Sequence, residues 1–492
     1  MPRPLVLAID IGTSSVRASI YNASLQPQQS IQVRYRWQTT RDGRTEKDAA
    51  QLLEHVAAAI DGAVAGTDRP IAAVAIAAFW HSLLGVDGDG RPVTPLLPWS
   101  DLRASREADD LRRRLDERAI HRRTGCRLHP SYWPARLRWF HRHEKRTFDR
   151  VARWISFTEL LEQKWLGRRG VSVSQASATG LMHQDTCEWD TALLRACRID
   201  RERLAPIVDL DDRGELSGRM QRRWPSLAGA HWVPAAGDGA LNNVGAGCVT
   251  RTRAAVMIGT SGAMRVLWQQ REDERVTVPF GLWRYRLDRT RPIVGGALSN
   301  GGNVREWLMR MLAGRTDDPR VSRSHQDALQ RRADALAPDA HGLTMLPFLA
   351  GTRSPDYLVD ARGTITGLTL ATRPEDLLRA GMEAIAYRFA AMFDELKKDV
   401  RIREIVAAGG GLERSEAWTQ ILADVLERPI RLCAASELTS RGTAAVALEQ
   451  AGLLKLESVA PPRGRQIRPG AARSRIYQAA RDRQQALFRR MM

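Results

Sequence analysis

The chain opens on the segment Leu5-Val-Leu-Ala-Ile-Asp-Ile-Gly-Thr-Ser-Ser-Val-Arg-Ala-Ser-Ile-Tyr21, which holds its most informative pattern. An apolar strand ends at Asp10, a tight turn spans residues 12–15, and a second β-branched strand covers residues 16–21. Such a hairpin directs backbone N–H groups and hydroxyls at one point, which suits a phosphate. Asp10 lies where a carboxylate can hold Mg²⁺ through water. The alternative is an ordinary hairpin with a polar turn.

A second strand and turn, Met257-Ile-Gly-Thr-Ser-Gly-Ala263, repeats this pattern in the other half of the chain. Its small residues let backbone amides approach an anion. Two such turns can grip a triphosphate from both sides. That arrangement suits phosphoryl transfer, because catalysis there is mostly positioning and charge stabilisation. The repetition predicts two related α/β domains that face each other across a cleft, with a boundary near residues 248–253.

Length and composition indicate a globular protein with two domains. At 492 residues the chain exceeds one ordinary core, and we place its domains at residues 1–249 and 250–460, followed by a basic tail at 461–492 that carries a final helix. No apolar run reaches the length of a membrane span, and no signal-peptide pattern precedes the first strand. Five scattered cysteines without a C-x-x-C pair favour a reducing cytosol over zinc or disulfides. We therefore predict a cytoplasmic protein that does not bind membranes.

The net charge of +19 raises the alternative of nucleic-acid binding. Arginine is spread along the chain, and its densest block is the tail, where nine arginines stand against the single acid Asp482. Such charge attracts polyanions non-specifically, but no zinc finger, RNP motif or basic zipper accompanies it. We predict no specific nucleic-acid partner and interpret the charge as a solvated surface that helps to draw in anionic substrates.

Hydrophobic periodicity predicts the elements that carry these motifs. The first half contains an apolar run fit for a buried strand and two arginine-rich helices, at residues 71–79, 104–120 and 135–143. The second half contains a capping-box pattern that begins a helix, a short strand, a helix capped by Ser415 and a last helix, at residues 372–375, 404–408, 415–428 and about 474–490.

The run Ala236-Gly-Asp-Gly-Ala240 holds the best candidate for a catalytic carboxylate. Asp238 lies between two glycines just before the predicted domain boundary, at the floor of the expected cleft. A lone Asp in a glycine turn is more often structural, but the phosphate turns require an acceptor for the proton of a substrate hydroxyl. We therefore predict Asp238 as the general base. A further run, Gly409-Gly-Gly411, could lie flat against a planar ring or a ribose, with a flexible loop as its alternative.

Two further clusters suit a polyol site. Phe79-Trp-His-Ser82 ends the predicted strand at residues 71–79, and Trp99-Ser-Asp-Leu-Arg103 follows a proline-rich turn. Such residues offer an aromatic wall and charged hydrogen-bond partners, and we predict substrate contacts from Trp80, His81, Trp99, Asp101 and Arg103. A satisfied buried histidine is the alternative for His81. The P-loop and Rossmann classes are disfavoured, because neither G-x-x-x-x-G-K-[ST] nor an opening G-x-G-x-x-G is present.

Taken in order, these motifs resemble the FGGY carbohydrate kinases, of the actin/hexokinase/Hsp70-like ATPase fold, over essentially the whole chain. The matching segments are Asp10-Ile-Gly-Thr-Ser-Ser15 with Arg17, Trp99-Ser-Asp-x-Arg103, Trp154-Ile-Ser-Phe-Thr158, Ser174-Gln-Ala-Ser-Ala-Thr-Gly180, Gly237-Asp238, Gly259-Thr-Ser261, Gly363-Thr-Ile-Thr-Gly-Leu368, Gly409-Gly-Gly-Leu-Glu-Arg-Ser415, Trp418-x-Gln420 and Ala423-Asp424. The resemblance implies an α/β fold with two RNase H-like domains around a central cleft, and an enzyme that uses ATP and Mg²⁺.

The same likeness implies a role for individual residues. Asp10 would serve the Mg²⁺ site, and Asp238 would be the base. The ATP-binding residues would be Gly12, Thr13, Ser14, Arg17, Gly259, Thr260, Gly302, Gly410, Gly411 and Ser415.

Within the family, Phe79-Trp-His-Ser-Leu-Leu-Gly-Val-Asp87 and His129-Pro-Ser-Tyr-Trp-Pro-Ala-Arg-Leu-Arg-Trp139 look most like the gluconokinase branch. They add Arg136 to the expected substrate contacts. Arg136 stands where the family usually has Lys, and Ser100 stands where Asn or Ala is common. Gly381 lies in a helix where a larger residue is usual.

The predicted reaction is therefore ATP-dependent phosphorylation of a sugar or sugar acid. The favoured reaction converts gluconate to 6-phosphogluconate. A gluconate carboxylate would want a cationic partner, which Arg103 or Arg136 could supply. A xylulokinase or another ketose or polyol kinase is the alternative within the family. A non-catalytic ATP-binding protein of the same fold is the alternative outside it. The expected partner is a small sugar or sugar acid, and a homodimer is left open.

Overall fold

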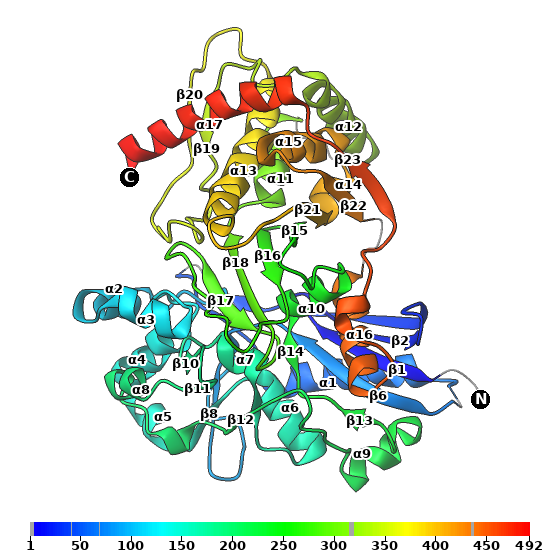
Figure 1. Ribbon diagram of the computed structural model, residues 1–492. Coiled ribbons are helices and arrows are strands. Elements are labelled where there is room, and N and C mark those ends of the chain that lie inside the picture. Colours follow the sequence, from blue (N-terminus) through cyan, green and yellow to red (C-terminus); the bar gives the residue numbers. More distant parts are fainter. Residues whose placement is uncertain (1–3, 41, 68, 314–318, 434–436) are drawn as a thin grey trace. The chain divides into compact units, whose positions relative to one another are not determined.

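The computed structural model describes residues 4–40, 42–67, 69–313, 319–433 and 437–492, and the chain forms two compact units (Figure 1). Unit 1 combines Met1–Val249 with Leu267–Ile293 and Glu437–Ala460, and unit 2 combines Thr250–Val266 with Val294–Ser436 and Pro461–Met492. The predicted domains are continuous, whereas the structure assigns residues 267–293 and 437–460 to unit 1. It also includes residues 461–492 in unit 2 rather than leaving them as a separate tail.

Unit 1 is built on a sheet with the strand order β13-β6-β1-β2-β3, in which β14 also pairs with β6. These strands are β1 (Leu5–Ile11), β2 (Ser15–Asn22), β3 (Pro27–Arg34), β6 (Ile71–Ala78), β13 (His231–Trp232) and β14 (Ala236–Gly237). Strands β1, β13 and β14 run parallel to β6, whereas β2 is antiparallel to both of its neighbours. The predicted opening hairpin and the predicted buried strand at 71–79 are confirmed.

Helices and shorter strands complete the described part of unit 1. The helices are α1 (Ala49–Val64), α2 (Ser105–Arg114), α3 (Glu117–Thr124), α4 (Trp133–His143), α5 (Lys145–Arg150), α6 (Phe157–Leu166), α7 (Val173–Ser177), α8 (Thr191–Cys197), α9 (Gly218–Arg223), α10 (Asp238–Gly245) and α16 (Leu438–Gln450), with 3-10 turns at Arg201–Arg203, Pro225–Leu227 and Leu456–Ser458. The shorter strands are β4 (Gln38–Thr39), β5 (Thr45–Glu46), β7 (Leu84–Val86), β8 (Arg153–Ile155), β9 (Val171–Ser172), β10 (Met182–His183), β11 (Glu188–Trp189), β12 (Ile207–Val208) and β17 (Trp283–Arg286).

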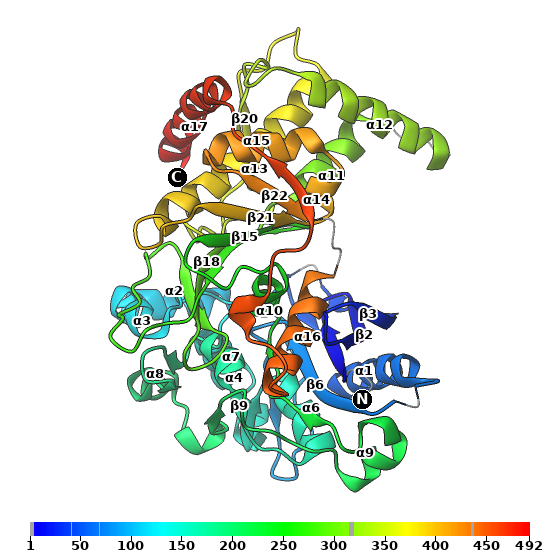
Figure 2. The ribbon, with the colours of Figure 1, turned by 45° about the vertical axis from the view of Figure 1, so that its right-hand side comes forward.

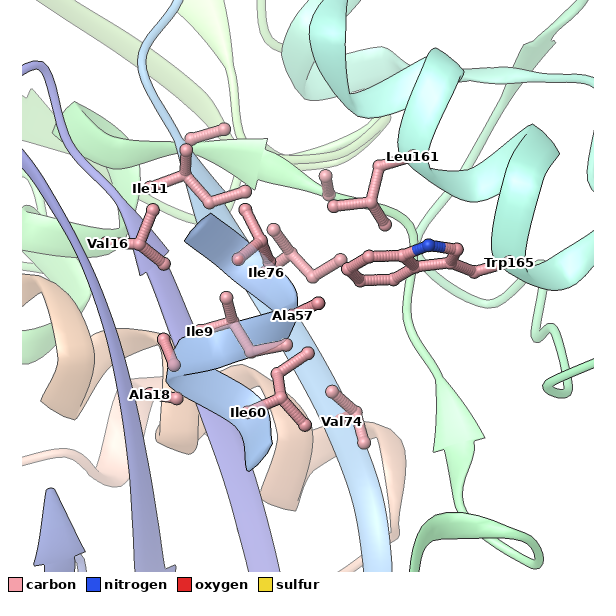
Figure 3. Close-up of a cluster of buried hydrophobic side chains, with 14 of the residues drawn as sticks. Ile9, Ile11, Val16, Ala18, Ala57, Ile60, Val74, Ile76, Leu161 and Trp165 are labelled. Atoms are coloured by element: carbon pink, nitrogen blue, oxygen red, sulfur yellow. The ribbon is translucent and has the colours of Figure 1, made fainter. Parts of the chain in front are cut away.

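Side chains of β1 alternate between two hydrophobic cores, as the pleat of a strand requires. The odd-numbered residues of 5–11 lie in a core that includes α1, part of which Figure 3 shows. Val6 and Ala8 lie in a second core that includes α16. Asp10 continues this even-numbered row at the carboxyl end of the strand, so the pleat directs it to the face that α16 covers.

Helix α16 belongs to unit 1 because it packs closely on α10. A Cβ atom at Gly442 of α16 would lie 1.8 Å from the carbonyl oxygen of Leu241, and one at Gly245 of α10 would lie 1.8 Å from that of Leu438. Only glycine at both positions lets the two backbones approach this far. Periodicity within a single helix carries no sign of such a long-range contact, which is why the predicted domain boundaries miss it.

The predicted helix at 104–120 is wrong as a single element. It divides into α2 and α3, and the backbone is extended at Leu115 and Asp116. The carboxylate of Asp116 accepts from the N–H of Ala119 at 3.0 Å and so begins a new helix. The predicted helix at 135–143 is confirmed as α4, which begins two residues earlier.

Unit 2 is built on a second sheet with the strand order β18-β16-β15-β21-β22-β23. The strands are β15 (Arg253–Ile258), β16 (Gly262–Leu267), β18 (Pro292–Leu298), β21 (Glu404–Ala408), β22 (Ile430–Cys433) and β23 (Gly464–Ile467), with a separate pair β19 (Thr344–Leu346) and β20 (Thr364–Thr366). The helices within the described residues are α11 (Gly302–Leu312), α12 (Pro319–Ala335), α13 (Pro374–Leu396), α14 (Gly410–Glu413), α15 (Glu416–Leu426) and α17 (Ala471–Met491). The predicted strand at 404–408 is confirmed as β21.

Helix α13 is the central helix of unit 2. Helices α11, α12, α15 and α17 contact it, and α17 lies beside it in both ribbon views (Figure 1, Figure 2). A Cβ atom at Gly381 would lie 2.5 Å from Cδ1 of Leu308 in α11, so the unusual glycine at this position allows the two helices to pack closely. The predicted cap at Thr372 is displaced by one residue, since the N–H of Arg373 donates to Asp376 at 2.8 Å and the helix begins at Pro374.

The last helix is confirmed as α17, which begins three residues before its predicted start. Within the ranges that the structure describes, no helix is both long and apolar enough to cross a membrane.

His121 in α3 is expected to make the stability of unit 1 depend on pH. Its ring is 1% exposed, Nε2 donates to the carbonyl of Leu282 at 2.7 Å, and burial lowers the pKa to about 4. The unfolded chain takes up a proton near pH 6.5 and the folded chain only near 4. The free energy of unfolding should therefore fall by about 3 kcal/mol as the pH drops through this interval.

Urea unfolding of the wild type and of His121→Gln at pH 7.5 and 4.5 measures this effect. Glutamine can still donate to Leu282 but does not titrate, so carboxylates contribute equally to both proteins. We expect the free energy of unfolding to fall more for the wild type than for His121→Gln between pH 7.5 and 4.5. An equal fall in the free energy of unfolding of both proteins between the two pH values would exclude His121 as the cause.

Candidate active site

Two carboxylates of unit 1, Asp10 and Asp238, lie at the carboxyl ends of parallel strands. Asp10 in β1 and Ala236 in β14 are both registered with Ala77 of β6, and Asp238 begins α10 directly after β14. Burial and, second, the charge of Asp238 raise the pKa of Asp10 to about 7, whereas Arg17 acts in the opposite direction. The structure therefore brings the predicted metal ligand and the predicted base together as one acidic pair.

The sequence suggests that Asp238 lies in a glycine turn. In the structure it lies in the first turn of a helix, α10. Its Oδ1 accepts from the N–H of Gly239 at 2.7 Å. The partial positive charge at a helix N-terminus favours an ionised carboxylate there. The short strand β14 is too brief to be recognised from periodicity, and the flanking glycines hide the start of α10.

The first predicted phosphate turn, at residues 12–15, is braced by two aromatic residues. The hydroxyl of Tyr35 donates to the carbonyl of Gly12, and its N–H donates to the carbonyl of Ser14 at 3.0 Å. The indole N–H of Trp37 donates to the carbonyl of Thr13 at 2.6 Å. Thr13 and Ser14 are themselves exposed. The carbonyl groups of the turn are thus engaged by protein donors, while two of its three hydroxyl-bearing residues are exposed.

Arg17 lies beside this turn and is engaged by a carboxylate. It is registered with Asp10 across the β1–β2 pair, and its guanidinium forms an ion pair with Glu437 directly before α16. An anionic ligand at Arg17 would therefore take the place that Glu437 holds.

Trp80 packs closely against the backbone that carries Asp238. A Cβ atom at Gly237 would lie 1.9 Å from Cε2 and Nε1 of the indole ring, so only glycine fits before Asp238. The ring N–H donates to the carbonyl of Ser174 at 3.1 Å. Trp80 is 6% exposed. Its contact with Gly237 places the predicted aromatic wall directly beside the predicted base.

His81 is the next residue, and its ring is enclosed by aromatic side chains. Nδ1 lies 2.6 Å from the carbonyl oxygen of Ala178, and because a carbonyl can only accept, Nδ1 carries the proton. The ring lies edge-on to Tyr132 and Tyr285, with centroids 5.0 and 5.7 Å away. Trp283 stacks on Tyr285 with centroids 4.1 Å apart.

Sequence reasoning misses these three aromatic partners. Trp283 and Tyr285 are two residues apart in β17, so they lie on one face of a strand, and this alternation is the only local signal of their role. Tyr132 precedes α4, and its hydroxyl lies 2.6 Å from that of Tyr285. Nothing in the sequence indicates that these distant segments meet at His81.

The predicted substrate contacts Asp101 and Arg103 bind each other. Asp101 is fully buried and accepts from the N–H of Thr45 at 2.7 Å and from Nε of Arg103 at 2.9 Å. Arg103 also donates to Glu46 at 2.7 Å, and its guanidinium lies 5.2 Å from the ring centroid of Trp139. This pair braces the 45–46 and 101–103 segments, and the role of its two residues as direct substrate contacts stays a prediction. Trp99 is partly buried and packs against the core that includes α1.

Arg136 also departs from its predicted role as a substrate contact. Its side chain is fully buried, and its guanidinium donates to three backbone carbonyls of unit 1. Burial lowers its pKa to about 10, which still leaves it charged at neutral pH. A local motif shows the residue type at position 136 but not the groups that its guanidinium reaches.

In unit 2, the second predicted phosphate turn, at residues 259–261, contacts the start of α11. The N–H of Gly302 donates to the carbonyl of Gly259 at 2.8 Å, and that of Asn303 donates to Thr260 at 3.0 Å. A Cβ atom at Gly302 would lie 2.4 Å from the oxygen of Gly259, so glycine is required for this approach. Thr260 is exposed. Two of the predicted ATP-binding segments are thereby joined.

The glycine run at 409–411 lies at the same sheet edge. Met257 of β15 is registered with Ala408 of its parallel partner β21, so Gly409 follows beside the turn. Gly409 has φ +112°, and a Cβ atom there would lie 2.5 Å from the oxygen of Ile258. A Cβ atom at Gly410 would meet nothing within 4 Å. Position 410 is thus open, whereas 409 can only be glycine.

Ser415 and Gly411 lie deeper in unit 2. The predicted helix cap is confirmed, since the hydroxyl of Ser415 accepts from the N–H of Trp418 at 3.1 Å. That hydroxyl also lies 3.0 Å from Oδ1 of Asp334, and the residue is 2% exposed. A Cβ atom at Gly411 would lie 3.0 Å from the ring of Trp418. The hydroxyl of Ser415 is thus buried and engaged by the protein, and its contact with ATP stays a prediction.

Gly259→Val should weaken ATP binding without unfolding unit 2. A Cβ atom at Gly259 would meet nothing within 4 Å, so the new side chain would extend into open space in front of the turn. It would block the approach of a phosphate to the backbone N–H groups, and a lost charge-assisted hydrogen bond corresponds to a rise in Kd of about ten- to a hundredfold. Calorimetric titration with ATP measures it.

Gly88→Val is the matched control, because position 88 in unit 1 is equally open and distant in sequence from both turns. An unchanged ATP affinity in folded Gly259→Val would show that this turn does not bind the phosphates.

The comparisons with known proteins place the chain in a family. The N-terminal domain model of the FGGY family of carbohydrate kinases matches residues 5–245, and the C-terminal domain model matches residues 254–451. The chain therefore belongs to the FGGY family of carbohydrate kinases, as its motifs suggest.

Individual relatives are similar over nearly their whole length. The gluconokinase of Bacillus subtilis (strain 168) is 27% identical over 462 residues, which cover 91% of this chain and 88% of that protein. The xylulose kinase of Staphylococcus xylosus is 24% identical over 445 residues, which cover 90% of each. The crystal structure of gluconate kinase from Lactobacillus acidophilus matches with a TM-score of 0.91 at 23% identity, covering 99% of this chain and 97% of that one. This last likeness confirms the predicted two-domain α/β fold.

Proposed function

We propose that this protein transfers the γ-phosphoryl group of ATP to the terminal hydroxyl of a sugar acid, D-gluconate, to give 6-phosphogluconate. The observation that carries the proposal is the pair Asp10 and Asp238 at one edge of the unit 1 sheet. A base beside a carboxylate suited to a metal ion is what phosphorylation of a hydroxyl by ATP requires.

In this mechanism Asp238 is the general base. The N-terminus of α10 and the N–H of Gly239 favour its ionised form. Asp238 accepts the proton of the terminal hydroxyl while the hydroxyl oxygen attacks the γ-phosphorus in line. A P–O bond to the sugar forms, the P–O bond to ADP breaks, and ADP leaves with the electron pair. Backbone N–H groups of the glycine-rich turn at residues 12–15 stabilise the charge on the phosphates.

The acidic pair fits a magnesium ion. Two neighbouring carboxylates, one of which has its pKa raised by burial and by the other, form a hard oxygen donor set whose repulsion a divalent cation relieves. Asp10 would hold Mg²⁺ through water, and the bound ion would neutralise charge on the phosphates.

The choice of gluconate is supported by likeness rather than by a recognised carboxylate contact. The segments around His81 and Arg136 look most like gluconokinases, and a gluconokinase is among the relatives at 27% identity. Because Arg103 and Arg136 already bind groups of the protein, we assign the carboxylate of the sugar to neither. Xylulose is the second candidate, since a xylulose kinase is similar over the same length of chain.

The same proposal makes the enzyme a cytoplasmic one whose partner is a small sugar or sugar acid. A homodimer, the absence of a specific nucleic-acid partner and the absence of membrane binding stay predictions from composition. A non-catalytic ATP-binding role is disfavoured by the acidic pair, which such a protein would not need.

A coupled ADP-release assay with gluconate, xylulose, ribulose, glycerol and fuculose tests the proposal. We expect gluconate to have the highest kcat/KM, by about ten- to a hundredfold, the range that a single charge-assisted hydrogen bond spans. A profile led by xylulose or another neutral sugar would reject gluconate but keep the kinase. Sugar-independent ATP binding without turnover of any sugar would favour the non-catalytic alternative.

A further inference from the structure

Arg136 in α4 is a buried cation whose partners are carbonyl oxygens. Nε donates to Pro130 at 2.9 Å, Nη1 donates to His81 at 2.6 Å, and Nη2 donates to Pro98. The side chain is 0% exposed. Burying a charge is costly unless it is hydrogen-bonded, and here one planar group binds three chain segments at once.

One of these segments has an unfavourable backbone. His81 has φ +70°, a left-handed conformation that residues other than glycine rarely adopt without support. Its carbonyl accepts from Arg136, and its ring Nδ1 donates to Ala178 at 2.6 Å. These two contacts restrain the residue at its backbone and at its side chain. Relaxation of the backbone at 81 would therefore turn the ring away from Ala178.

The other two segments lead into further parts of the same site. Pro98 directly precedes Trp99, and Pro130 lies two residues before Tyr132, whose ring faces His81. Arginine has a planar fork of donors that can reach several acceptors at once, whereas the ammonium group of lysine is a single point. This difference explains why arginine rather than the lysine usual in the family suits the three carbonyls.

We propose that Arg136 is a positioning residue of the sugar site: it holds the left-handed backbone at His81 and the segment before Trp99 in one arrangement, and it does not bind the substrate itself. The inference rests on the proposed function and states which part of the site sets affinity for the sugar. Because all three nitrogens of the guanidinium donate to backbone carbonyls, acidic and neutral sugars depend on it equally.

Steady-state kinetics of Arg136→Lys test this role, with Arg138→Lys as the matched control. Arg138 lies on the same helix and donates to Asp110 at 2.6 Å instead of to the site segments. We expect Arg136→Lys to raise KM for the best sugar by about ten- to a hundredfold, the cost of a displacement of about 1 Å. Two other quantities should stay within about twofold of their wild-type values, a difference of about 0.4 kcal/mol. They are the KM for ATP and the ratio of kcat/KM for gluconate to kcat/KM for xylulose. Arg138→Lys should leave all of these values unchanged.

A second background separates positioning from general packing. His81→Gly removes the strain at position 81, because glycine adopts a left-handed backbone freely. Adding Arg136→Lys to His81→Gly should then change the sugar KM far less than it does in the wild type. Full additivity, or a gluconate-to-xylulose ratio that collapses in Arg136→Lys alone, would overturn the proposal, the latter by showing a direct contact with the carboxylate.

A spectroscopic readout does not depend on activity. Selective ¹⁵N labelling of the ten histidines reports the tautomer of each ring. We expect His81 to show the Nδ1–H tautomer in the wild type and in Arg138→Lys, and to lose it in Arg136→Lys. An unchanged His81 signal in folded Arg136→Lys would overturn the proposal. If the wild type phosphorylates no sugar, the proposed function fails, and this measurement still decides the role of Arg136.

Discussion

Asp238→Asn is expected to lower kcat by about 10²–10⁴-fold, the contribution of a lost general base. Asparagine keeps the size of the side chain and can still accept from the N–H of Gly239, but it does not take up the proton of a hydroxyl. ATP binding should persist. The pKa of Asp10 should also fall from about 7, because the charge of Asp238 is the second cause of its elevation.

Single-turnover kinetics and ATP titration of the same preparation separate these effects. Asp211→Asn is a suitable control, because it removes an exposed carboxylate of unit 1. Near-normal turnover in Asp238→Asn would exclude this residue as the base. Loss of ATP binding together with turnover would instead indicate that Asp238 belongs to the nucleotide site.

Gly237→Ala is expected to lower kcat/KM by about 10²-fold, although it adds only one methyl group. The new Cβ atom would lie 1.9 Å from the ring of Trp80. That ring cannot withdraw easily, since it donates to Ser174 and lies edge-on to Trp283 and Tyr285 at 5.9 and 5.0 Å. The backbone that carries Asp238 must move instead, and a displacement of about 1 Å can cost about 10²-fold in rate.

Gly229→Ala serves as the control, because a Cβ atom there would meet nothing within 4 Å. Trp80→Phe in the Gly237→Ala protein offers a second test, because the smaller ring relieves the collision and should restore part of the lost activity. Wild-type kinetics in Gly237→Ala would show that the contact between Trp80 and Gly237 does not position the base.

Local patterns were enough to predict the parts of the fold that depend on neighbours in the sequence. The alternation and the polar turn of residues 5–21 define β1 and β2, and the cap at Ser415 defines the start of α15. The pairing of Asp10 with Asp238 could not be predicted in this way, because β14, the strand that leads to Asp238, is too brief to be recognised from periodicity. The repeated Gly-Thr-Ser motif also predicts the second turn, which lies between β15 and β16.

What could not be predicted depends on contacts between distant segments. The guanidinium of Arg136 reaches carbonyls at positions 81 and 98, and Asp101 accepts from Thr45. The motif alone predicts that Arg136 and Asp101 are free to bind a ligand. In the folded chain both are already hydrogen-bonded to other parts of the protein. The return of residues 437–460 to unit 1 is a similar case, because the close packing of Gly442 on α10 appears only in three dimensions.

Transfer of labelled phosphate from [γ-³²P]ATP to gluconate, with identification of the product, tests the central claim most directly. The account predicts a labelled sugar acid that carries a phosphomonoester on its terminal hydroxyl, formed by the wild type at a rate that Asp238→Asn reduces by about 10²–10⁴-fold. Release of labelled inorganic phosphate without a labelled sugar acid, or equal labelling by the wild type and Asp238→Asn, would contradict it.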